Sequence, residues 1–275
     1  MQFIMFTKHL EGLDLSGIIE ALKSVGVSGA DLAVRPGYPV HPGNVEKELP
    51  IAASRFADEG LSIPLVTTPG DFTTPDIEYA DRLYAACGES GVRHIKLGYW
   101  HWKAGDKYWE MLDQCRGYLD GFQKLSAKHE VQTMVHNHSG TCMGLNASSS
   151  MHLLKGFDPQ HVGSFADAGH LSICGEPIAM ALNIVAEYLS AIAFKDLFRE
   201  PRKQNGRTTW QTGMARISRG FVDWPLTLKT LKSMNFTGPI SMHSEYGGEP
   251  VESVIDLTRI DLRYIRRVLD DVSSE

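Results

Sequence analysis

The chain has 275 residues, of which 43% are hydrophobic and 22% are charged, and its formal net charge is −6. This composition is typical of a globular protein, and the negative charge argues against a nucleic-acid or membrane-surface partner. No stretch approaches the ~20 consecutive apolar residues of a membrane span. The length fits one α/β barrel, which commonly uses about 250 residues as a single domain.

The cysteines and the N-terminus predict a compartment. The four cysteines form no C-x-x-C pair and no zinc-finger spacing, and they lie at positions 87, 115, 142 and 174. Met1 is followed by a short apolar segment without the basic leader and cleavage site of a signal peptide. We therefore expect a reducing, cytoplasmic location.

Strand-like apolar runs and helix-like apolar stripes alternate eight times along the chain. The expected strands are 3–9, 29–35, 61–66, 92–97, 131–140 (ending in a polar turn), 162–167, 189–196 and 238–245. The expected helices are 15–25, 44–59, 76–87, 107–129, 148–154, 178–186, 224–234 and 251–269. A polar segment with five arginines, 197–220, is expected to be a loop.

A repeated strand–helix unit predicts a parallel sheet, and eight units of this size predict closure into a (β/α)8 barrel. We expect this barrel to be a single domain spanning residues 1–275. The alternative is a doubly wound open sheet. It lacks support because the first strand-to-helix turn carries no G-x-G-x-x-G motif.

Polar side chains gather where the expected strands end. In the fifth strand, Met134, His136 and His138 share one face because strand side chains alternate. The polar residues at the strand ends are Lys8, His9, Arg35, Trp100, Trp102, His136, His138, Asp167, His170, Lys195, Asp196, His243 and Glu245. In a (β/α)8 barrel the active site lies at these C-terminal strand ends, so the residues predict a functional mouth. The structural alternative is that they satisfy one another without a ligand.

Six short motifs add a family resemblance. They are GADLAVRPG at 29–37, VHNHSG at 135–140, DAGH at 167–170, FKD at 194–196, RGFVDW at 219–224 and GPISMHSEY at 238–246. In this order the chain resembles the xylose isomerase-like sugar-phosphate isomerase/epimerase superfamily. The resemblance implies a (β/α)8 barrel that holds one divalent cation and acts on sugars or polyols. Isomerases, epimerases, dehydratases and lyases all occur in this superfamily.

The resemblance also implies a metal site, with departures. The superfamily's usual ligands are Glu, Asp, His and Glu from the fifth to eighth strands. Here these positions fall on His136, Asp167, Ala193 and His243. The implied ligands are therefore His136, Asp167 and His243, with Glu245 or His138 left open as additions. Two imidazoles favour Mn, Zn, Co or Fe over Mg.

The same departures change the expected catalytic groups. The superfamily's epimerases use the two ligand glutamates as opposed bases, and neither glutamate is present here. Glu245, Lys195 and His170 remain as acid–base candidates. Lys195 should share the inward face with Ala193, where its ammonium would stabilise an enolate or replace the metal. The alternative for Lys195 is an ordinary salt bridge.

Four residues are candidates for substrate binding. Arg35 could hold an anionic or polyhydroxylated ligand through its forked donors, or it could simply pair with a nearby acid. Trp100 and Trp102 could stack on a sugar ring, or they could pack in the core. His138 would face the same mouth as His136. The arginines of segment 197–220 could close over a substrate, although a solvated loop is the default.

Together these features predict a divalent-metal-dependent sugar isomerase or epimerase that enolises a sugar-like carbonyl or polyol. A dehydratase or lyase acting on a keto-sugar or inosose-like substrate is the enzymatic alternative. A carbohydrate-binding barrel without catalysis is the alternative of another class. The expected partner is a small sugar or polyol, and a homo-oligomer is left open. No Gly-rich phosphate loop opens a helix.

Overall fold

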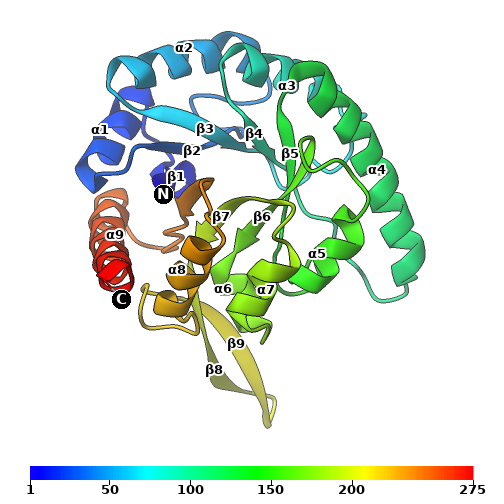
Figure 1. The fold of residues 1–275 in the computed structure, drawn as a ribbon, viewed down its shortest axis with the longest axis vertical. Helices are drawn as coiled ribbons and strands as arrows, with labels where there is room; N and C mark the ends of the chain where they lie inside the picture. The colour runs from blue at the N-terminus through cyan, green and yellow to red at the C-terminus, as the bar shows by residue number, and fades with distance from the viewer. Residues whose placement is uncertain (275) are drawn as a thin grey trace.

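Eight parallel strands close into a barrel in the computed structural model of the chain, which describes residues 1–274 (Figure 1). The strands pair in the order β1-β10-β7-β6-β5-β4-β3-β2, and β1 closes the ring by pairing with both β10 and β2. Their bounds are β1 Gln2–Phe6, β2 Gly29–Ala33, β3 Ser62–Thr67, β4 His94–Lys96, β5 Gln132–His136, β6 Val162–Asp167, β7 Leu189–Phe194 and β10 Pro239–Met242. The predicted (β/α)8 barrel is confirmed, and the open-sheet alternative is excluded.

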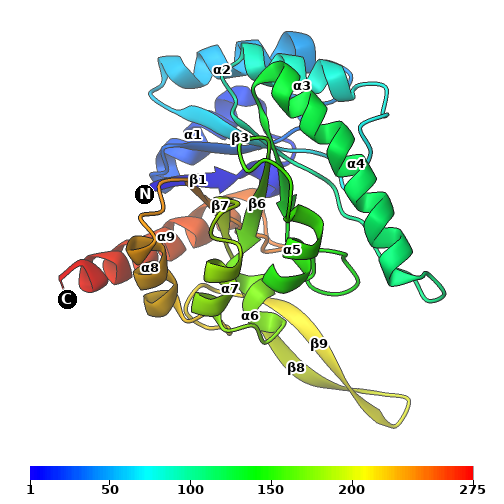
Figure 2. The same cartoon turned by 45° about the vertical axis from the view of Figure 1, so that its right-hand side comes forward.

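Helices surround this barrel as an outer layer (Figures 1 and 2). Their bounds are α1 Leu15–Val25, α2 Val45–Asp58, α3 Ala80–Glu89, α4 Tyr108–His129, α5 Ala147–Leu154, α7 Ile178–Ile184, α8 Trp224–Ser233 and α9 Val251–Ser274. The last helix, α9, packs against both α1 and α8, so the two ends of the chain complete one ring. No helix within residues 1–274 is long and apolar enough to cross a membrane.

Helix α1 shows how local sequence sets these elements. Ile18 and Leu22 lie on its buried face, one helical turn apart. Asp14 caps the N-terminus by accepting a 2.8 Å hydrogen bond from the backbone of Gly17. Gly26 ends the helix in the left-handed region, at φ 85°, which a glycine adopts without steric cost.

Small and large apolar side chains fill the interior of the barrel. The cluster consists of Ile4, Leu65, Met134, Phe165, Ala191 and Ala193. Because strand side chains alternate, the next inward position after Met134 is His136, and the next after Ala193 is Lys195. The apolar layer therefore lies directly beneath the polar side chains at the C-terminal strand ends.

Two short helices lie at strand ends where the sequence predicted other structure. The first strand ends at Phe6, and a 3-10 helix, η1 Thr7–Leu10, carries Lys8 and His9. After β6 a short helix, α6 Ala168–Ile173, begins directly. Asp167 caps it through a 3.0 Å hydrogen bond from the backbone of His170 to Oδ1.

The loop predicted for residues 197–220 is wrong over most of its length. Strands β8 Asp196–Gln204 and β9 Arg207–Ala215 form an antiparallel hairpin that projects from the barrel (Figure 2). Asn205 and Gly206 make its turn with φ of 50° and 73°, as a two-residue Asn-Gly turn requires. The polar composition of residues 197–220 indicated a loop, although the Asn-Gly pair within it is typical of a hairpin turn.

Asp196 anchors the return from the hairpin to α8. Its carboxylate accepts hydrogen bonds from the backbones of Leu197, Ser218, Gly220 and Val222 and from Nε1 of Trp224, at 3.0–3.3 Å. A Cβ at Gly220 would lie 2.0 Å from this carboxylate, so only glycine allows the approach. Asp196 is therefore a structural residue of the strand end, not part of the mouth.

We expect Asp196→Ala to lower the free energy of unfolding by at least about 3 kcal/mol, since several buried donors lose their acceptor together. Urea unfolding followed by circular dichroism measures this change. Asp223→Ala, which removes the exposed N-cap of α8, is the matched control and should cost only about 1 kcal/mol. Equal losses in the two variants would contradict the anchoring role.

Candidate active site

A cavity of about 150 Å³ opens at the C-terminal ends of the barrel strands. Its walls come from β1, β2, β3, β4, β5, β7 and β10 or from the residues that follow them. The lining residues are Phe6, Lys8, Arg35, Thr67, Gly70, Lys96, Tyr99, His136, His138, Lys195, His243 and Glu245. We call this the mouth cavity. Six of the ten residues predicted for the site line it.

Three predicted ligands converge beside the mouth cavity. His136, Asp167 and His243 each offer one ligand atom, and these atoms lie within 4.8 Å of one another. Nε2 of His136 and Nδ1 of His243 are buried without a well-aligned hydrogen-bond partner, and Oδ2 of Asp167 lies 3.4 Å from Nε2 of His136. Buried polar atoms without a partner are costly. The donor set therefore fits a divalent cation.

Two neighbours orient the histidine ligands. The Tyr99 hydroxyl lies 2.8 Å from Nδ1 of His136, and Oδ2 of Asp31 lies 3.2 Å from Nε2 of His243. Protons on these two nitrogens leave the lone pairs of the opposite nitrogens free, as in histidines that bind metals. Burial holds the pKa of His136 well below its ordinary value, so this imidazole is neutral at physiological pH, as a ligand must be.

Lys195 points into the mouth and joins two carboxylates. Its Nζ lies 3.2 Å from Oδ2 of Asp167 and 2.9 Å from Oε2 of Glu245. Burial opposes the charged forms, but Lys195 holds the pKa of both carboxyls well below the ordinary range. The two carboxylates in turn raise the pKa of Lys195 against its burial. All three groups are therefore charged at neutral pH.

His170 and His138 form a neighbouring imidazole pair with ring centroids 3.9 Å apart. Nδ1 of His170 hydrogen-bonds Oγ of Ser139 at 2.9 Å, and its Nε2 lies 3.9 Å from Oδ2 of Asp167. Burial lowers the pKa of His170 to about 3. A neutral His170 is not a cationic proton donor at neutral pH, and it does not line the mouth cavity.

The remaining substrate-binding candidates divide into two groups. Arg35 is half-buried and lines the mouth cavity. Trp100 is buried, and its Nε1 donates to the carbonyl of Thr73, whereas Trp102 is 36% exposed and donates to the carbonyl of Asp106. Neither tryptophan lines the cavity, so their placement supports packing over stacking on a sugar.

Sequence reasoning missed three residues of the site, which are Asp31, Lys96 and Tyr99. Asp31 is fully buried and accepts hydrogen bonds from Thr67 and Ser241 as well as facing His243. Lys96 ends β4, and its Nζ lies 3.6 Å from the centroid of the Tyr99 ring. A lysine near the C-terminal end of an expected strand was the available signal.

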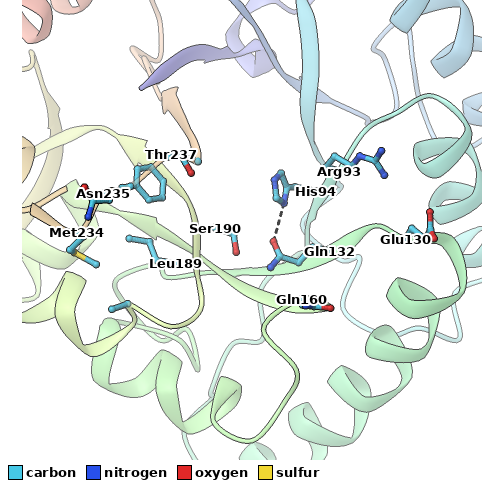
Figure 3. A pocket seen from close by; sticks show the side chains of 13 residues that line it. Arg93, His94, Glu130, Gln132, Gln160, Leu189, Ser190, Met234, Asn235 and Thr237 are labelled. Atoms are coloured by element: carbon cyan, nitrogen blue, oxygen red, sulfur yellow. Dashed lines mark hydrogen bonds between the residues drawn. The ribbon is translucent and has the colours of Figure 1, made fainter. Parts of the chain in front are cut away.

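A larger hollow of about 610 Å³ lies at the opposite end of the barrel, where the strands begin (Figure 3). Two of its polar side chains have protein partners: Nδ1 of His94 lies 2.9 Å from Oε1 of Gln132, and Nε2 of Gln132 donates to the carbonyl of Pro159. Within residues 1–274, none of the buried atoms without a partner belongs to this hollow. The mouth cavity is therefore the better candidate site, despite its smaller size.

We expect Lys195→Met to lower the free energy of unfolding by about 3–5 kcal/mol at pH 7, because it leaves a buried carboxylate without its cation. The carboxyl pKa values are depressed in the folded protein. The ion pairs therefore stabilise the fold at pH values above ~4, the ordinary pKa of a carboxyl group. This stabilisation is lost as the pH falls below that value. The difference in the free energy of unfolding between wild type and Lys195→Met should therefore shrink below about pH 4.

Urea unfolding in a chelating buffer at pH 7, 5 and 3 measures this difference. Lys128→Met, which removes an exposed partner of Asp81, is the control and should change stability by less than about 0.5 kcal/mol. An equally small effect of Lys195→Met at pH 7 would contradict the ion-pair assignment.

Known proteins share the sequence pattern and the fold of this chain. Residues 19–268 match the family described as the xylose isomerase-like TIM barrel. An inosose dehydratase from Lactiplantibacillus plantarum is 25% identical over 171 residues, which cover 60% of this chain and 55% of that relative. The match thus spans little more than half of that dehydratase.

Two solved structures show the same fold at low identity. The IOLI protein, solved with a bound zinc atom, has a TM-score of 0.77 at 14% identity and covers 96% of this chain and 98% of its own. The 3-keto-D-glucoside 4-epimerase of E. coli has a TM-score of 0.72 at 12% identity and covers 97% and 99%. Since the family match spans most of the sequence, this chain belongs to the xylose isomerase-like TIM barrel family.

Proposed function

We propose that this protein is an enzyme of the isomerase/epimerase type that enolises a sugar-like carbonyl or polyol in the mouth cavity. One observation carries the proposal. Glu245 is the one carboxylate among the residues that line the cavity, and the two histidine ligands and Lys195 line the same space. A base, an acid and a candidate metal site thus face one small volume.

A divalent cation held by His136, Asp167 and His243 would polarise the substrate carbonyl as a Lewis acid. The two imidazoles favour Mn, Zn, Co or Fe over Mg. The zinc atom of the IOLI protein supports a site of this kind in the same fold. The buried nitrogens of His136 and His243 that lack a hydrogen-bond partner supply the independent support.

The protein's own groups then divide the proton transfers. Glu245 is ionised and removes the proton from the carbon next to the carbonyl. Lys195 keeps its proton and donates a hydrogen bond to the oxygen on which negative charge develops. We assign Arg35 and His138 to substrate binding. His170, as a neutral imidazole, supports His138 through its ring contact and does not serve as the acid.

A dehydratase is the second candidate, and the Lys195–Glu245 pair favours it. With 2.9 Å between their charged atoms, the base and the acid act from one side of the substrate. That arrangement suits loss of water or a shift on one face, whereas epimerisation through an enolate needs a group on each face. The partial similarity to an inosose dehydratase supports this candidate as well.

We propose a cytoplasmic location and a small polyhydroxylated ligand, with no nucleic-acid or membrane partner. The four cysteines are all free thiols in the described structure, as expected in a reducing compartment. The net charge of −6 disfavours binding to phosphate backbones or anionic lipids. A homo-oligomer remains compatible with this function.

We expect Asp167→Asn to abolish stoichiometric metal binding without unfolding the protein. The amide keeps the oxygen that caps α6 and replaces the oxygen that faces the histidines. Elemental analysis after loading with Mn, Co or Zn measures the effect, with the exposed Asp158→Asn as control. The metal assignment is wrong if the loaded wild type holds no ion.

We expect Glu245→Gln to slow exchange of the substrate's C–H proton with solvent by roughly 10²–10⁴-fold, because the base is lost. Proton NMR in D₂O with a panel of ketoses, keto-sugars and inososes measures this exchange. Metal content should be unchanged. Glu249→Gln, an exposed change in the same loop, is the matched control and should keep full activity.

The products separate the candidate functions. A new aldose or ketose identifies an isomerase or epimerase, and an unsaturated ketone that absorbs in the ultraviolet identifies a dehydratase. Ligand binding without any exchange in the metal-loaded wild type would instead identify a carbohydrate-binding barrel. Efficient epimerisation that persists in Glu245→Gln would show that the base is misassigned.

A further inference from the structure

Four cationic side chains line the mouth cavity, and only two of them have anionic partners. Lys8 pairs with Glu245 at 3.1 Å, and Lys195 pairs with Glu245 and Asp167. In the part of the chain that the structure describes, neither Arg35 nor Lys96 forms an ion pair, although both line the cavity. Two basic side chains at one site thus have no ion-pair partner.

Lys96 is the more unusual of the two. Its residue is only 1% exposed, and Nζ has no hydrogen-bond partner. The Tyr99 ring, 3.6 Å from Nζ, supplies a cation–π contact, which offsets only part of the several kcal/mol that burying an ammonium costs. Burial and then Arg35 hold the pKa of Lys96 well below its ordinary value. The buried amine therefore lacks the acceptor that a bound anion would supply.

Arg35 approaches the same space from β2. Its guanidinium lies over the Phe6 ring, 5.6 Å from the centroid, and its buried Nε has no partner. The charge of Arg35 is close enough to disfavour that of Lys96. An anion bound by both would convert this repulsion into two attractions, and a guanidinium fork matches a planar carboxylate in particular.

We infer that Arg35 and Lys96 form an anion subsite of the mouth cavity that binds the carboxylate of a sugar acid or polyhydroxy acid. This inference rests on the proposed function, because the same cavity would hold the reacting carbon. The cavity is small, at about 150 Å³. A carboxylate in place of a terminal hydroxymethyl group adds a single oxygen, whereas phosphorylation adds a whole phosphoryl group. The size therefore favours the carboxylate.

The subsite also sets the direction of the substrate. Arg35 and Lys96 belong to the β2–β4 side of the mouth, and the candidate metal ligands belong to β5, β6 and the residue after β10. A carboxylate bound by Arg35 and Lys96 would direct the rest of the substrate's carbon chain toward Glu245 and the candidate metal ligands. The selectivity for acids over neutral sugars would then come from residues that take no part in proton transfer.

Calorimetric titration in a chelating buffer and after metal loading tests the subsite without turnover. The probes are D-glucuronate, D-gluconate and D-glycerate, each paired with its neutral counterpart, D-glucose, D-glucitol and glycerol. Glycerol 3-phosphate and inorganic phosphate test the other source of an anion. At least one carboxylate should bind tenfold or more tightly than its neutral counterpart, and it should also bind more tightly than either phosphate.

This preference should be lost in Lys96→Met and in Arg35→Met and retained in Lys103→Met, an exposed change in the loop after β4. Lys96→Met should melt at or above the wild-type temperature, because it removes a buried amine that has no hydrogen-bond partner. Arg35→Met, at a half-buried position, gives an independent readout if Lys96→Met fails to fold.

The inference is overturned if no carboxylate outbinds its neutral counterpart, if a phosphate outbinds every carboxylate, or if both variants keep the preference. The proposed function fails separately. Tight carboxylate binding with no proton exchange in the wild type would leave the subsite standing and remove the enzyme. Proton exchange on neutral sugars, with no preference for acids, would support the enzyme and rule out the carboxylate subsite.

Discussion

The ion pairs of Lys195 with Asp167 and Glu245 are the interaction on which the mouth of this barrel depends. Two carboxylates cannot share a buried space unless a cation compensates them. Ala193 leaves the seventh strand without a side chain that could ligate a metal, and Lys195, two residues on, brings a positive charge to the same face. The end of the seventh strand thus contributes a charged partner to the mouth rather than a metal ligand. A metal ion bound at Asp167 would share that carboxylate with the ammonium.

The histidines beside this pair depend on residues outside the ligand set. Tyr99 and Asp31 hold His136 and His243 in defined orientations, and the Phe6 ring stacks on His243 at 4.6 Å. Asp31 is itself satisfied by two hydroxyl donors. Four residues that line the cavity, Arg35, Lys96, His136 and His243, nevertheless keep buried polar atoms without a hydrogen-bond partner. Buried polar atoms without partners are expected where a ligand would bind.

The two ends of the barrel differ in how completely their polar groups are paired. Apolar side chains fill its interior, and polar groups at the strand starts pair among themselves. Polar groups at the strand ends are only partly paired and surround the mouth cavity. Substitutions near His94 and Gln132 should therefore change stability alone, whereas substitutions in the mouth should also change charge and ligand binding.

Sequence alone determined the barrel and most of the mouth, because alternation of side chains and repetition of strand–helix units are local properties. It correctly placed His136, Lys195 and their neighbours at strand ends. The hairpin of residues 196–215 was missed, because its one local signal is an Asn-Gly turn pair within a polar segment. Sequence alone also could not decide that Trp100 turns into the core or that Lys96 lacks an anion. Those facts depend on distances between strands far apart in the sequence, and only the closed barrel sets these distances.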